Sequence, residues 1–369
     1  MYKERVTEMF GLTGVALNGS SPYDLQVNDE RFYKRLLRDG SLGAGESYMD
    51  GWWDVERLDE LVEMITHADL TRKLSHNWRF AATALLARIT NLQSRARASN
   101  AVKNHYDIGN DLYQNMLGEQ MIYTCGYWKN ADTLEQAQIA KMDLICKKLN
   151  LQAGQKILDI GCGWGSFAKF AAKKYSVEVT GITISEEQKR FAEESCSGLP
   201  VTVKLQDYRD LSGQFDHVVS IGMFEAVGHK DFRTFMKAVS NVLKDDGLFL
   251  LHTIGSNKSV TTTDPWIRKY IFQSGMLPSI SQIGKSIENL FIMEDWHNFG
   301  ADYDKTLMAW HRNFNDHWAE LQKKYGDRFR RMWNFYLLSC AGTFRARGMQ
   351  LWQIVLSKKG LQGGYNSLK

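Results

Sequence analysis

The spacing of apolar residues divides the chain into two regions. Up to about residue 90, apolar residues recur every three or four positions, as they do along helices, and the pattern is interrupted by glycines expected to form turns, at Gly40, Gly43, Gly45 and Gly51. From residue 156 onward, short apolar runs alternate with helical stretches, which is typical of a doubly wound parallel sheet. The pattern predicts an α/β fold with a smaller, mainly helical N-terminal domain.

Six strands are predicted in the α/β region. They cover residues 156–160, 177–184, 201–205, 217–221, 247–251 and 351–356. The clearest helices between them are predicted at 186–195 and 230–243. Ahead of the first strand, the capping-box pattern Thr133-Leu-Glu-Gln136 predicts another helix, with apolar positions at Ile139, Met142, Ile145 and Leu149. We expect a helical domain over 1–90, a polar linker over 91–104 and an α/β domain over 105–369.

The net charge argues against a nucleic-acid partner. The 46 Lys and Arg exceed the 42 Asp and Glu by only four, whereas proteins that wrap nucleic acid usually carry a larger basic excess. The basic residues are nevertheless concentrated. Residues 71–106 contain seven and no acidic residue, and residues 265–369 contain 15 against 8 Asp and Glu. Such stretches either bind anionic lipid headgroups or form a solvated face.

Within the first basic stretch, one segment has the pattern of an amphipathic helix, with apolar positions at Trp78, Ala82, Leu85, Ile89 and Leu92. A basic amphipathic helix lies in a membrane interface or, more commonly, packs on the core of its own domain. The N-terminus lacks an apolar signal segment, and no apolar run approaches the ~18 residues of a membrane span. We therefore expect a cytoplasmic protein that meets lipid from the surface, at the inner face of the membrane.

The five cysteines lack C-x-x-C spacing, so neither a disulfide framework nor a metal site is predicted. The first predicted strand instead leads into a glycine turn, Leu158-Asp-Ile-Gly-Cys-Gly-Trp-Gly165. Its G-x-G-x-G spacing differs from the G-x-G-x-x-G of dinucleotide sites, and Asp159 would repel a diphosphate. The turn resembles the first motif of Rossmann-like class I methyltransferases that use S-adenosylmethionine. This resemblance implies cofactor contacts at Asp159, Gly161, Cys162, Gly163 and Gly165.

Two later segments fit the same class. Thr183 and Gln188 follow the second strand and could supply neutral hydrogen bonds to the ribose, where many such enzymes have an acidic residue. Alternatively, Gln188 forms only a capping box with Ser185. Asp207 and Tyr208 follow the third strand, where an adenine amine would seek an acceptor, although a loop aspartate is more often a turn residue.

The fourth and fifth strands carry the candidate chemistry. No N/D-P-P-Y motif follows the fourth strand, which disfavours methylation of an amino group. Glu225 and His252 instead follow the fourth and fifth strands at the ligand edge of the sheet. A glutamate and a histidine that converge there could hold a base or a small anion.

Motifs along nearly the whole chain resemble the bacterial cyclopropane-fatty-acyl-phospholipid synthase family. They are Gly40-Ser-Leu-Gly-Ala-Gly-Glu-Ser-Tyr-Met-Asp-Gly-Trp-Trp53, His105-Tyr-Asp-Ile-Gly-Asn110, Tyr123-Thr-Cys-Gly-Tyr-Trp128, Gly222-Met-Phe-Glu225, Leu251-His-Thr-Ile-Gly255, Trp296-His-Asn-Phe-Gly-Ala-Asp-Tyr303 and Phe344-Arg-Ala-Arg347. One departure is Ala226, where the family usually has histidine.

The resemblance implies transfer of a methylene group from S-adenosylmethionine to the cis double bond of an acyl chain in a phospholipid. Methyl transfer leaves a carbocation, and a base must then remove a proton so that the ring closes. The family implies that this base is a bound bicarbonate, held by Cys125, Glu225, His252, Tyr303 and the backbone of Ile254. Cys340 matches a cysteine sometimes assigned as catalytic, although no step requires a thiolate.

The resemblance also implies that Tyr123 and Thr124 contact the cofactor. The aromatic side chains expected to surround the carbocation and the lipid tail are Tyr123, Tyr127, Trp128, Trp164, Phe224 and Tyr303. The expected partner is a bilayer surface, with anionic lipid, which the helical domain would dock; a homodimer would add avidity. Two alternatives stay open: a methyltransferase of this fold that closes no ring, and a lipid-binding protein with a vestigial cofactor fold.

Overall fold

The computed structural model describes residues 2–68 and 109–369. The predicted amphipathic helix around Leu85, the predicted linker over 91–104, the whole of the first basic stretch and residues 105–108 of the motif that begins at His105 lie outside the described residues. The described chain forms two compact units. The first contains residues 2–68, 262–273 and 303–349, and the second contains the remainder.

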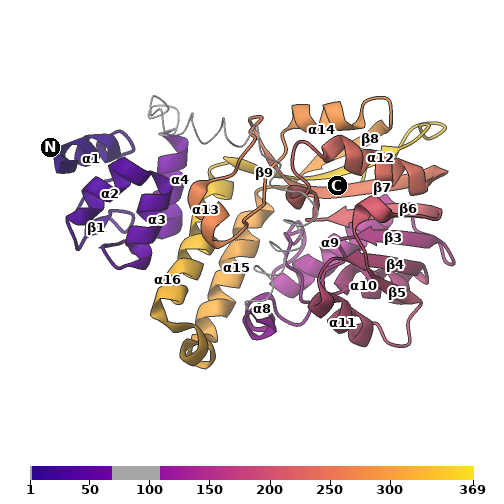
Figure 1. Cartoon of the computed structure of the whole chain (residues 1–369), viewed down its shortest axis with the longest axis horizontal. Coiled ribbons are helices and arrows are strands. Elements are labelled where there is room, and N and C mark those ends of the chain that lie inside the picture. The colour runs from indigo at the N-terminus through magenta and orange to yellow at the C-terminus, as the bar shows by residue number, and fades with distance from the viewer. Residues whose placement is uncertain (1, 69–108) are drawn as a thin grey trace. The chain divides into compact units, whose positions relative to one another are not determined.

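The composition of the first unit differs from the expected division of the chain. Its helices are α1 (Tyr2–Gly11), α2 (Arg31–Asp39), α3 (Ser41–Met49), α4 (Leu58–His67), α13 (Pro265–Tyr270), α15 (Asp302–Asp316) and α16 (Trp318–Arg345), and its short strands are β1 (Gln26–Val27) and β2 (Trp53–Asp54) (Figure 1). We expected 105–369 to form one domain, but α16 packs against α3 and α4, and α13 packs against α3. This unit is therefore made of segments that are distant in sequence and pack together, so no single boundary along the chain separates it from the second unit.

Two of the four glycines expected in turns lie inside a helix, so that prediction was wrong for Gly43 and Gly45. A Cβ at Gly43 would stand 2.4 Å from the carbonyl oxygen of Arg35, and one at Gly45 would stand 2.4 Å from the ring of Trp266. These glycines permit close packing of α3 on its neighbours. Gly40 and Gly51 do lie at helix ends, with positive φ.

The second unit is built on a seven-stranded sheet in the order β5-β4-β3-β6-β7-β9-β8. The strands are β3 (Lys156–Ile160), β4 (Glu178–Thr183), β5 (Val201–Leu205), β6 (Phe215–Ile221), β7 (Leu243–Ser256), β8 (Ile292–Asn298) and β9 (Met349–Ser357). Strands β3 to β7 pair in parallel, and β8 pairs antiparallel with β9. The doubly wound prediction is confirmed, and so are all six predicted strands; β8 was not predicted.

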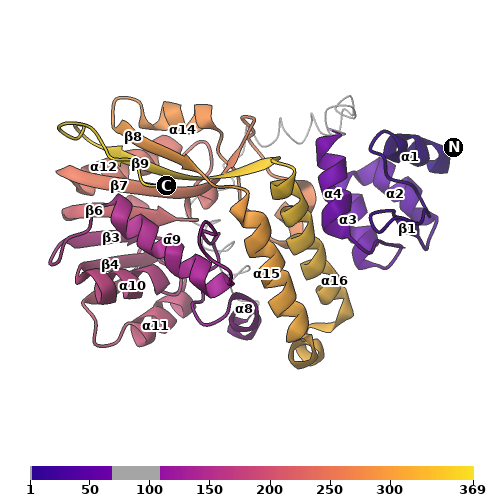
Figure 2. The same ribbon diagram turned by 180° about the vertical axis from the view of Figure 1, so that it is seen from behind.

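Helices cover both faces of this sheet. The helices of the second unit are α8 (Asn110–Leu117), α9 (Leu134–Lys148), α10 (Ser166–Tyr175), α11 (Glu186–Ser195), α12 (Phe232–Val242) and α14 (Ile280–Ile287). Helices α9 and α10 lie on one face, and α12 and α14 on the other, as the opposite views of Figures 1 and 2 show. Successive strand residues alternate between two buried clusters: Ile157 packs with α9 and Leu158 with α12. Side chains that face α9 therefore share one layer.

Helix α9 begins as predicted. The Thr133 hydroxyl accepts a hydrogen bond from the backbone N–H of Gln136 at 3.2 Å. Met142, Ile145 and Leu149 are buried, but the prediction for Ile139 was wrong, because its side chain is 37% exposed. The buried face of α9 also carries polar side chains, at Gln138, Lys141 and Lys148.

Candidate active site

The glycine turn lies where β3 ends and α10 begins. Gly161, Gly163 and Gly165 all have positive φ, at 82°, 55° and 83°, which side chains rarely tolerate. The backbone N–H groups of Gly161 and Cys162 donate to the carbonyl oxygen of Ile182 at 2.9 and 3.0 Å, which fixes the turn against β4. Since the chain order reverses between β4 and β6 on either side of β3, the turn sits at the switch point where open α/β sheets bind ligands.

Asp159 lies two residues before this turn and is 1% exposed. Burial raises the pKa of its carboxyl group to about 7, and the charge of Lys141 opposes that rise. Its Oδ1 atom has no hydrogen-bond partner among the described residues. A buried acceptor without a partner costs free energy, so this carboxyl group is suited to a donor supplied by a ligand.

The two residues expected to contact ribose bind one another. The Thr183 hydroxyl donates to Oε1 of Gln188 at 2.8 Å, and both side chains are buried. Ser185 caps α11 by accepting from the backbone N–H of Gln188 at 3.3 Å. Gln188 therefore has a capping role through its backbone, while its side chain and Thr183 lie together at the end of β4.

Asp207 and Tyr208 follow β5, and both contact Arg209. The Arg209 guanidinium donates to Asp207 at 2.9 Å and lies 4.5 Å from the centre of the Tyr208 ring. Asp207 also caps a short helical turn by accepting from the backbone N–H of Arg209. The turn role considered for Asp207 is thus present, and Arg209 partly satisfies its carboxylate.

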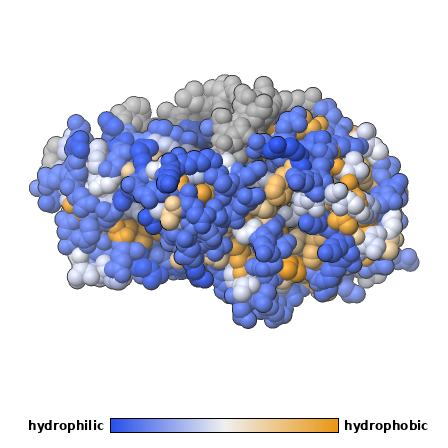
Figure 3. Space-filling view, turned by 90° about the horizontal axis from the view of Figure 1, so that it is seen from below, coloured by the Kyte–Doolittle hydropathy of each residue, from blue (hydrophilic) through white to orange (hydrophobic). Residues whose placement is uncertain are grey.

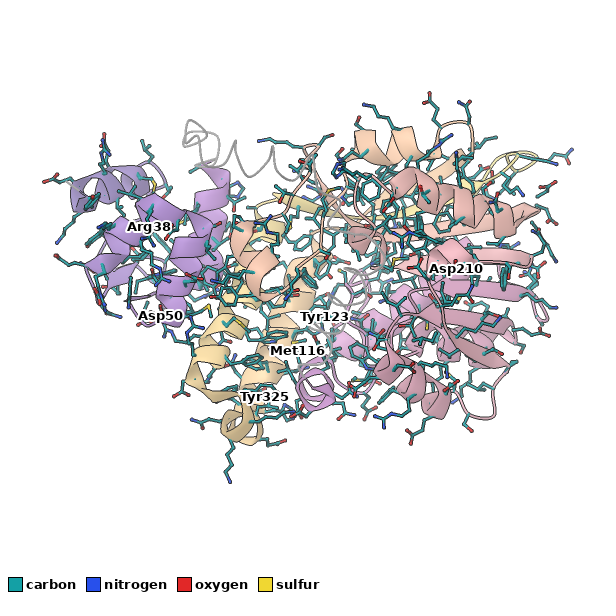
Figure 4. The ribbon with its side chains drawn as sticks, in the orientation of Figure 1. Arg38, Asp50, Met116, Tyr123, Asp210 and Tyr325 are labelled. Atoms are coloured by element: carbon teal, nitrogen blue, oxygen red, sulfur yellow. The ribbon has the colours of Figure 1, made fainter. Side chains whose placement is uncertain are left out.

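The segment after α8 supplies Tyr123, Thr124 and Cys125. Tyr123, labelled with Met116 of α8 in Figure 4, packs against Tyr113 with ring centres 5.4 Å apart. The Thr124 hydroxyl accepts a hydrogen bond from Nζ of Lys141 at 2.7 Å. Cys125 is buried, with its Sγ 3.1 Å from the carbonyl oxygen of Gly126.

Glu225 binds the end of β7. The backbone N–H of Ile254 donates to Oε1 of Glu225 at 2.6 Å, while Oε2 is shielded from solvent and has no partner among the described residues. The residue as a whole is partly exposed, but burial of its carboxyl group raises the pKa of Glu225 to about 7. The N–H of Ile254 is therefore already engaged, and Ile254 acts here by orienting Glu225.

His252 lies on β7 two residues before Ile254, and its carbonyl oxygen accepts from the N–H of Gly222 at 2.9 Å. This bond holds the segment of Glu225 beside β7. The Nδ1 atom of His252 lies 3.3 Å from Nε2 of Gln353, and with that amide as donor the neutral ring carries its proton on Nε2. Burial, with Lys141 and Lys148 nearby, holds the pKa of His252 well below its usual range. Nε2 of His252, a neutral N–H donor, and Oε2 of Glu225 are thus two buried polar atoms without partners among the described residues, and the segments that carry them both contact β7.

Tyr303 and Cys340 belong to the first unit. Tyr303 is buried and stacks on Phe344 with ring centres 4.4 Å apart. Burial raises the pKa of the Cys340 thiol to about 12, so this cysteine stays protonated at neutral pH. That state opposes a nucleophilic or basic role for Cys340.

Sequence reasoning missed three polar side chains of this layer, Lys141, Gln138 and Gln353. Gln138 donates to the carbonyl oxygen of Thr124 at 2.8 Å. Residues 138, 141, 145 and 148 share one helical face, which could have been found from the sequence. The predicted apolar position at Ile139 had indicated a different buried face of α9. Among the described residues, no group of acidic, histidine or cysteine side chains is placed to hold a metal ion.

The strand order and the glycine turn define a Rossmann-like class I methyltransferase fold. The coclaurine N-methyltransferase structure has this fold, with a TM-score of 0.70 over 85% of this chain, at 20% identity. The model of the mycolic acid cyclopropane synthetase family matches residues 93–354. The chain belongs to that family.

Individual relatives support this membership. The chain is 53% identical over 357 residues, 97% of its length and 93% of the relative's, to the cyclopropane-fatty-acyl-phospholipid synthase of Escherichia coli K12. The structure of the cyclopropane synthase MmaA2 from Mycobacterium tuberculosis matches with a TM-score of 0.66 and 31% identity, over 70% of this chain and 98% of that one. The resemblance is thus confirmed, and with it the prediction of an S-adenosylmethionine-dependent transferase.

Proposed function

We propose that this protein transfers a methylene group from S-adenosylmethionine to the cis double bond of an unsaturated acyl chain in a phospholipid, which gives a cyclopropane ring. The observation that carries the proposal is the similarity to the Escherichia coli phospholipid enzyme over 97% of the chain, helical N-terminal segment included. The mycolic acid cyclopropane synthase structures cover only about 70% of it.

The donor is proposed to lie over the glycine turn. A structure of the mycolic acid cyclopropane synthase CmaA1 contains S-adenosylhomocysteine, the product that the donor becomes after transfer. In this chain, the positive-φ glycines let a ligand approach the backbone, and Asp159 is an unpaired buried acceptor suited to an ammonium or hydroxyl group. An alkene is a weak nucleophile, so the transferred methyl group must be held in line with it in a dry site.

Glu225 and His252 are proposed to hold the base as a bound bicarbonate, which would supply a proton acceptor. The fit rests on their chemistry: a neutral Nε2–H that donates and a carboxyl Oε2 that accepts or, when protonated, donates. A bicarbonate ion can pair with both groups, because its oxygens accept hydrogen bonds and its O–H donates one. Cys125 and Tyr303 complete the proposed set, and Cys340 has no part in it.

The acceptor lipid is proposed to come from a bilayer surface, preferably an anionic one. No helix among the described residues is long and apolar enough to cross a membrane. On the face shown in Figure 3, apolar residues form separate patches in a mostly hydrophilic surface. The basic residues between positions 265 and 369 would attract anionic headgroups, and each one near the bilayer would contribute about 1 kcal/mol. A peripheral location and a homodimer belong to this proposal.

The test is incubation of the pure protein with S-adenosylmethionine and vesicles of unsaturated phosphatidylglycerol, followed by mass spectrometry of the acyl chains. The expected product has one added methylene group and no double bond, and its yield falls when dissolved carbon dioxide is removed. Vesicles with saturated chains serve as the control. Absence of any added methylene in unsaturated chains, with bicarbonate present, would contradict the proposal.

A second candidate is methyl transfer without ring closure. It is favoured by 37% identity over 73% of this chain to a probable fatty acid methyltransferase of Pseudomonas putida. Nuclear magnetic resonance of the same product separates the two functions. Cyclopropane protons support the first, and a branched methyl signal supports the second.

A further inference from the structure

The buried lysine at position 141 is the strongest feature that the proposed reaction does not yet use. Lys141 is 1% exposed, although its side chain ends in an amino group, and burial lowers the pKa of that group to about 7, so that a nearby anion would favour its charged form. It projects from α9 into the layer that contains Asp159 and His252, between that helix and the sheet. A buried ammonium group costs several kcal/mol unless charge and hydrogen bonds compensate it.

Lys141 acts on two parts of the candidate site: the segment that contains Thr124, and the end of β3 that contains Asp159. On one side, Nζ donates to the Thr124 hydroxyl at 2.7 Å. Thr124 in turn fits against Gly222, where a Cβ would stand 2.5 Å from the threonine methyl group. On the other side, the charge of Lys141 acts on Asp159, Cys125 and His252.

The charge balance of this layer shows why a cation is needed. Asp159 and Glu225 are both acidic, and His252 is neutral. An oxyanion placed beside Glu225 would meet a second acid in a medium of low dielectric, which is unfavourable without a countercharge. Lys148, the other buried lysine of α9, already pairs with Asp295 at 3.5 Å.

We propose that Lys141 is a positioning residue: its ammonium group is the countercharge that lets the site hold an oxyanion at Glu225 and His252, and its hydrogen bond fixes the loop of Thr124. This inference rests on the proposed function, because the oxyanion is the base of that reaction. It adds to the site a residue, Lys141, that lies outside the family motifs, and it attributes part of the affinity for an anion to a side chain of α9.

The experiment compares Lys141→Met, which keeps the length of the side chain without charge, with Thr124→Val, which removes the hydrogen-bond acceptor and leaves the charge. Binding of ¹³C-labelled bicarbonate is followed by nuclear magnetic resonance, and S-adenosylhomocysteine binding by calorimetry. Lys141→Met is expected to weaken bicarbonate binding, and to raise the bicarbonate concentration for half-maximal turnover, by about tenfold or more, the scale of a lost charged hydrogen bond. Thr124→Val is expected to weaken S-adenosylhomocysteine binding and leave bicarbonate binding unchanged.

Lys147→Met is the matched control, because Lys147 lies on the exposed side of the same helix and pairs with Asp143. Lys141→Gln, which retains an N–H donor without the charge, replaces the methionine variant if circular dichroism shows that the latter does not fold. A wild-type protein indifferent to bicarbonate would overturn the proposed base and this inference together. A bicarbonate-dependent wild type, with unchanged bicarbonate binding in folded Lys141→Met and Lys141→Gln, would overturn this inference alone.

Discussion

The two buried lysines of α9 differ in what surrounds them. Lys148 has two neighbours in the protein: its Nζ lies 3.5 Å from Oδ2 of Asp295, in an ion pair, and 3.1 Å from Nδ1 of His297, although Oδ2 of Asp295 accepts no hydrogen bond among the described residues. Lys141 has a hydroxyl neighbour and the carboxyl group of Asp159, which retains an unpaired oxygen. Lys148 thus completes an ion pair at one end of this helix face, whereas Lys141 makes no ion pair among the described residues at the other, incomplete end. The incomplete end is where a ligand is expected.

The largest expected effect separates chemistry from binding at the incomplete end. Glu225→Gln keeps an acceptor for the N–H of Ile254 but removes the ionisable carboxyl group. Turnover on vesicles should fall by about 10²- to 10⁴-fold, the usual range for loss of acid–base function. Affinity for S-adenosylhomocysteine, measured by calorimetry, should not change. Unchanged turnover would remove Glu225 from the reaction.

The next effect concerns the completed end. Lys148→Met leaves Asp295 buried without its cation, and this should lower the free energy of unfolding by about 3–5 kcal/mol. The measurement is urea denaturation, with turnover per folded molecule as a second readout that should stay near wild type. The double variant Lys148→Met, Asp295→Asn removes both charges and should recover much of the loss. Equal destabilisation in both variants would mean that packing, not charge, is responsible.

A pH series sharpens the same contrast. Burial lowers the pKa of Lys148 to about 8 from its ordinary value of 10.5, so the folded protein releases this proton at lower pH than the unfolded chain. Below pH 8 the folded state bears the cost of the buried charge, and the cost disappears as the pH rises toward 10.5. The difference in unfolding free energy between wild type and Lys148→Met should therefore grow over this window. A flat difference would show that the folded-state pKa is not depressed.

The smallest effect is expected on the solvent side of α9. Lys147 is 61% exposed and pairs with Asp143 at 2.7 Å. Solvent screens such a pair, so Lys147→Met should change the unfolding free energy by less than about 1 kcal/mol. A loss as large as that for Lys148→Met would contradict the distinction between the buried and exposed lysines.

Some parts of the site were predictable from the sequence, and the buried lysines of α9 were not. The glycine turn, and strands 156–160 and 201–205, were predicted to the residue because local spacing and backbone conformation determine them. Glu225 follows β6 as expected, whereas His252, expected after the fifth strand, lies within β7, which continues to Ser256. The buried lysines were not predicted, because a lysine is usually exposed and its burial depends on partners distant in sequence.

Long-range packing also accounts for the other misses. Strand β8 has the sequence Ile292-Met-Glu-Asp-Trp-His-Asn298, whose charges weaken the apolar signal, and it forms because β9 offers an antiparallel partner. Helix α16 joins the N-terminal helices through contacts such as Arg331 to the carbonyl oxygen of Trp53 at 3.0 Å. No local pattern indicates either pairing.

The discontinuous first unit has a consequence for synthesis. Helices α1 to α4 are synthesised long before α16, the helix that packs against α3 and α4 and ends at Arg345. The apolar surfaces of α3 and α4 that α16 covers therefore stay exposed to solvent while the intervening strands of the sheet are synthesised. Contacts of such long sequence separation form slowly, and exposed apolar surface promotes aggregation. The stretch of translation between α4 and α16 is thus the period when this protein should depend most on chaperones.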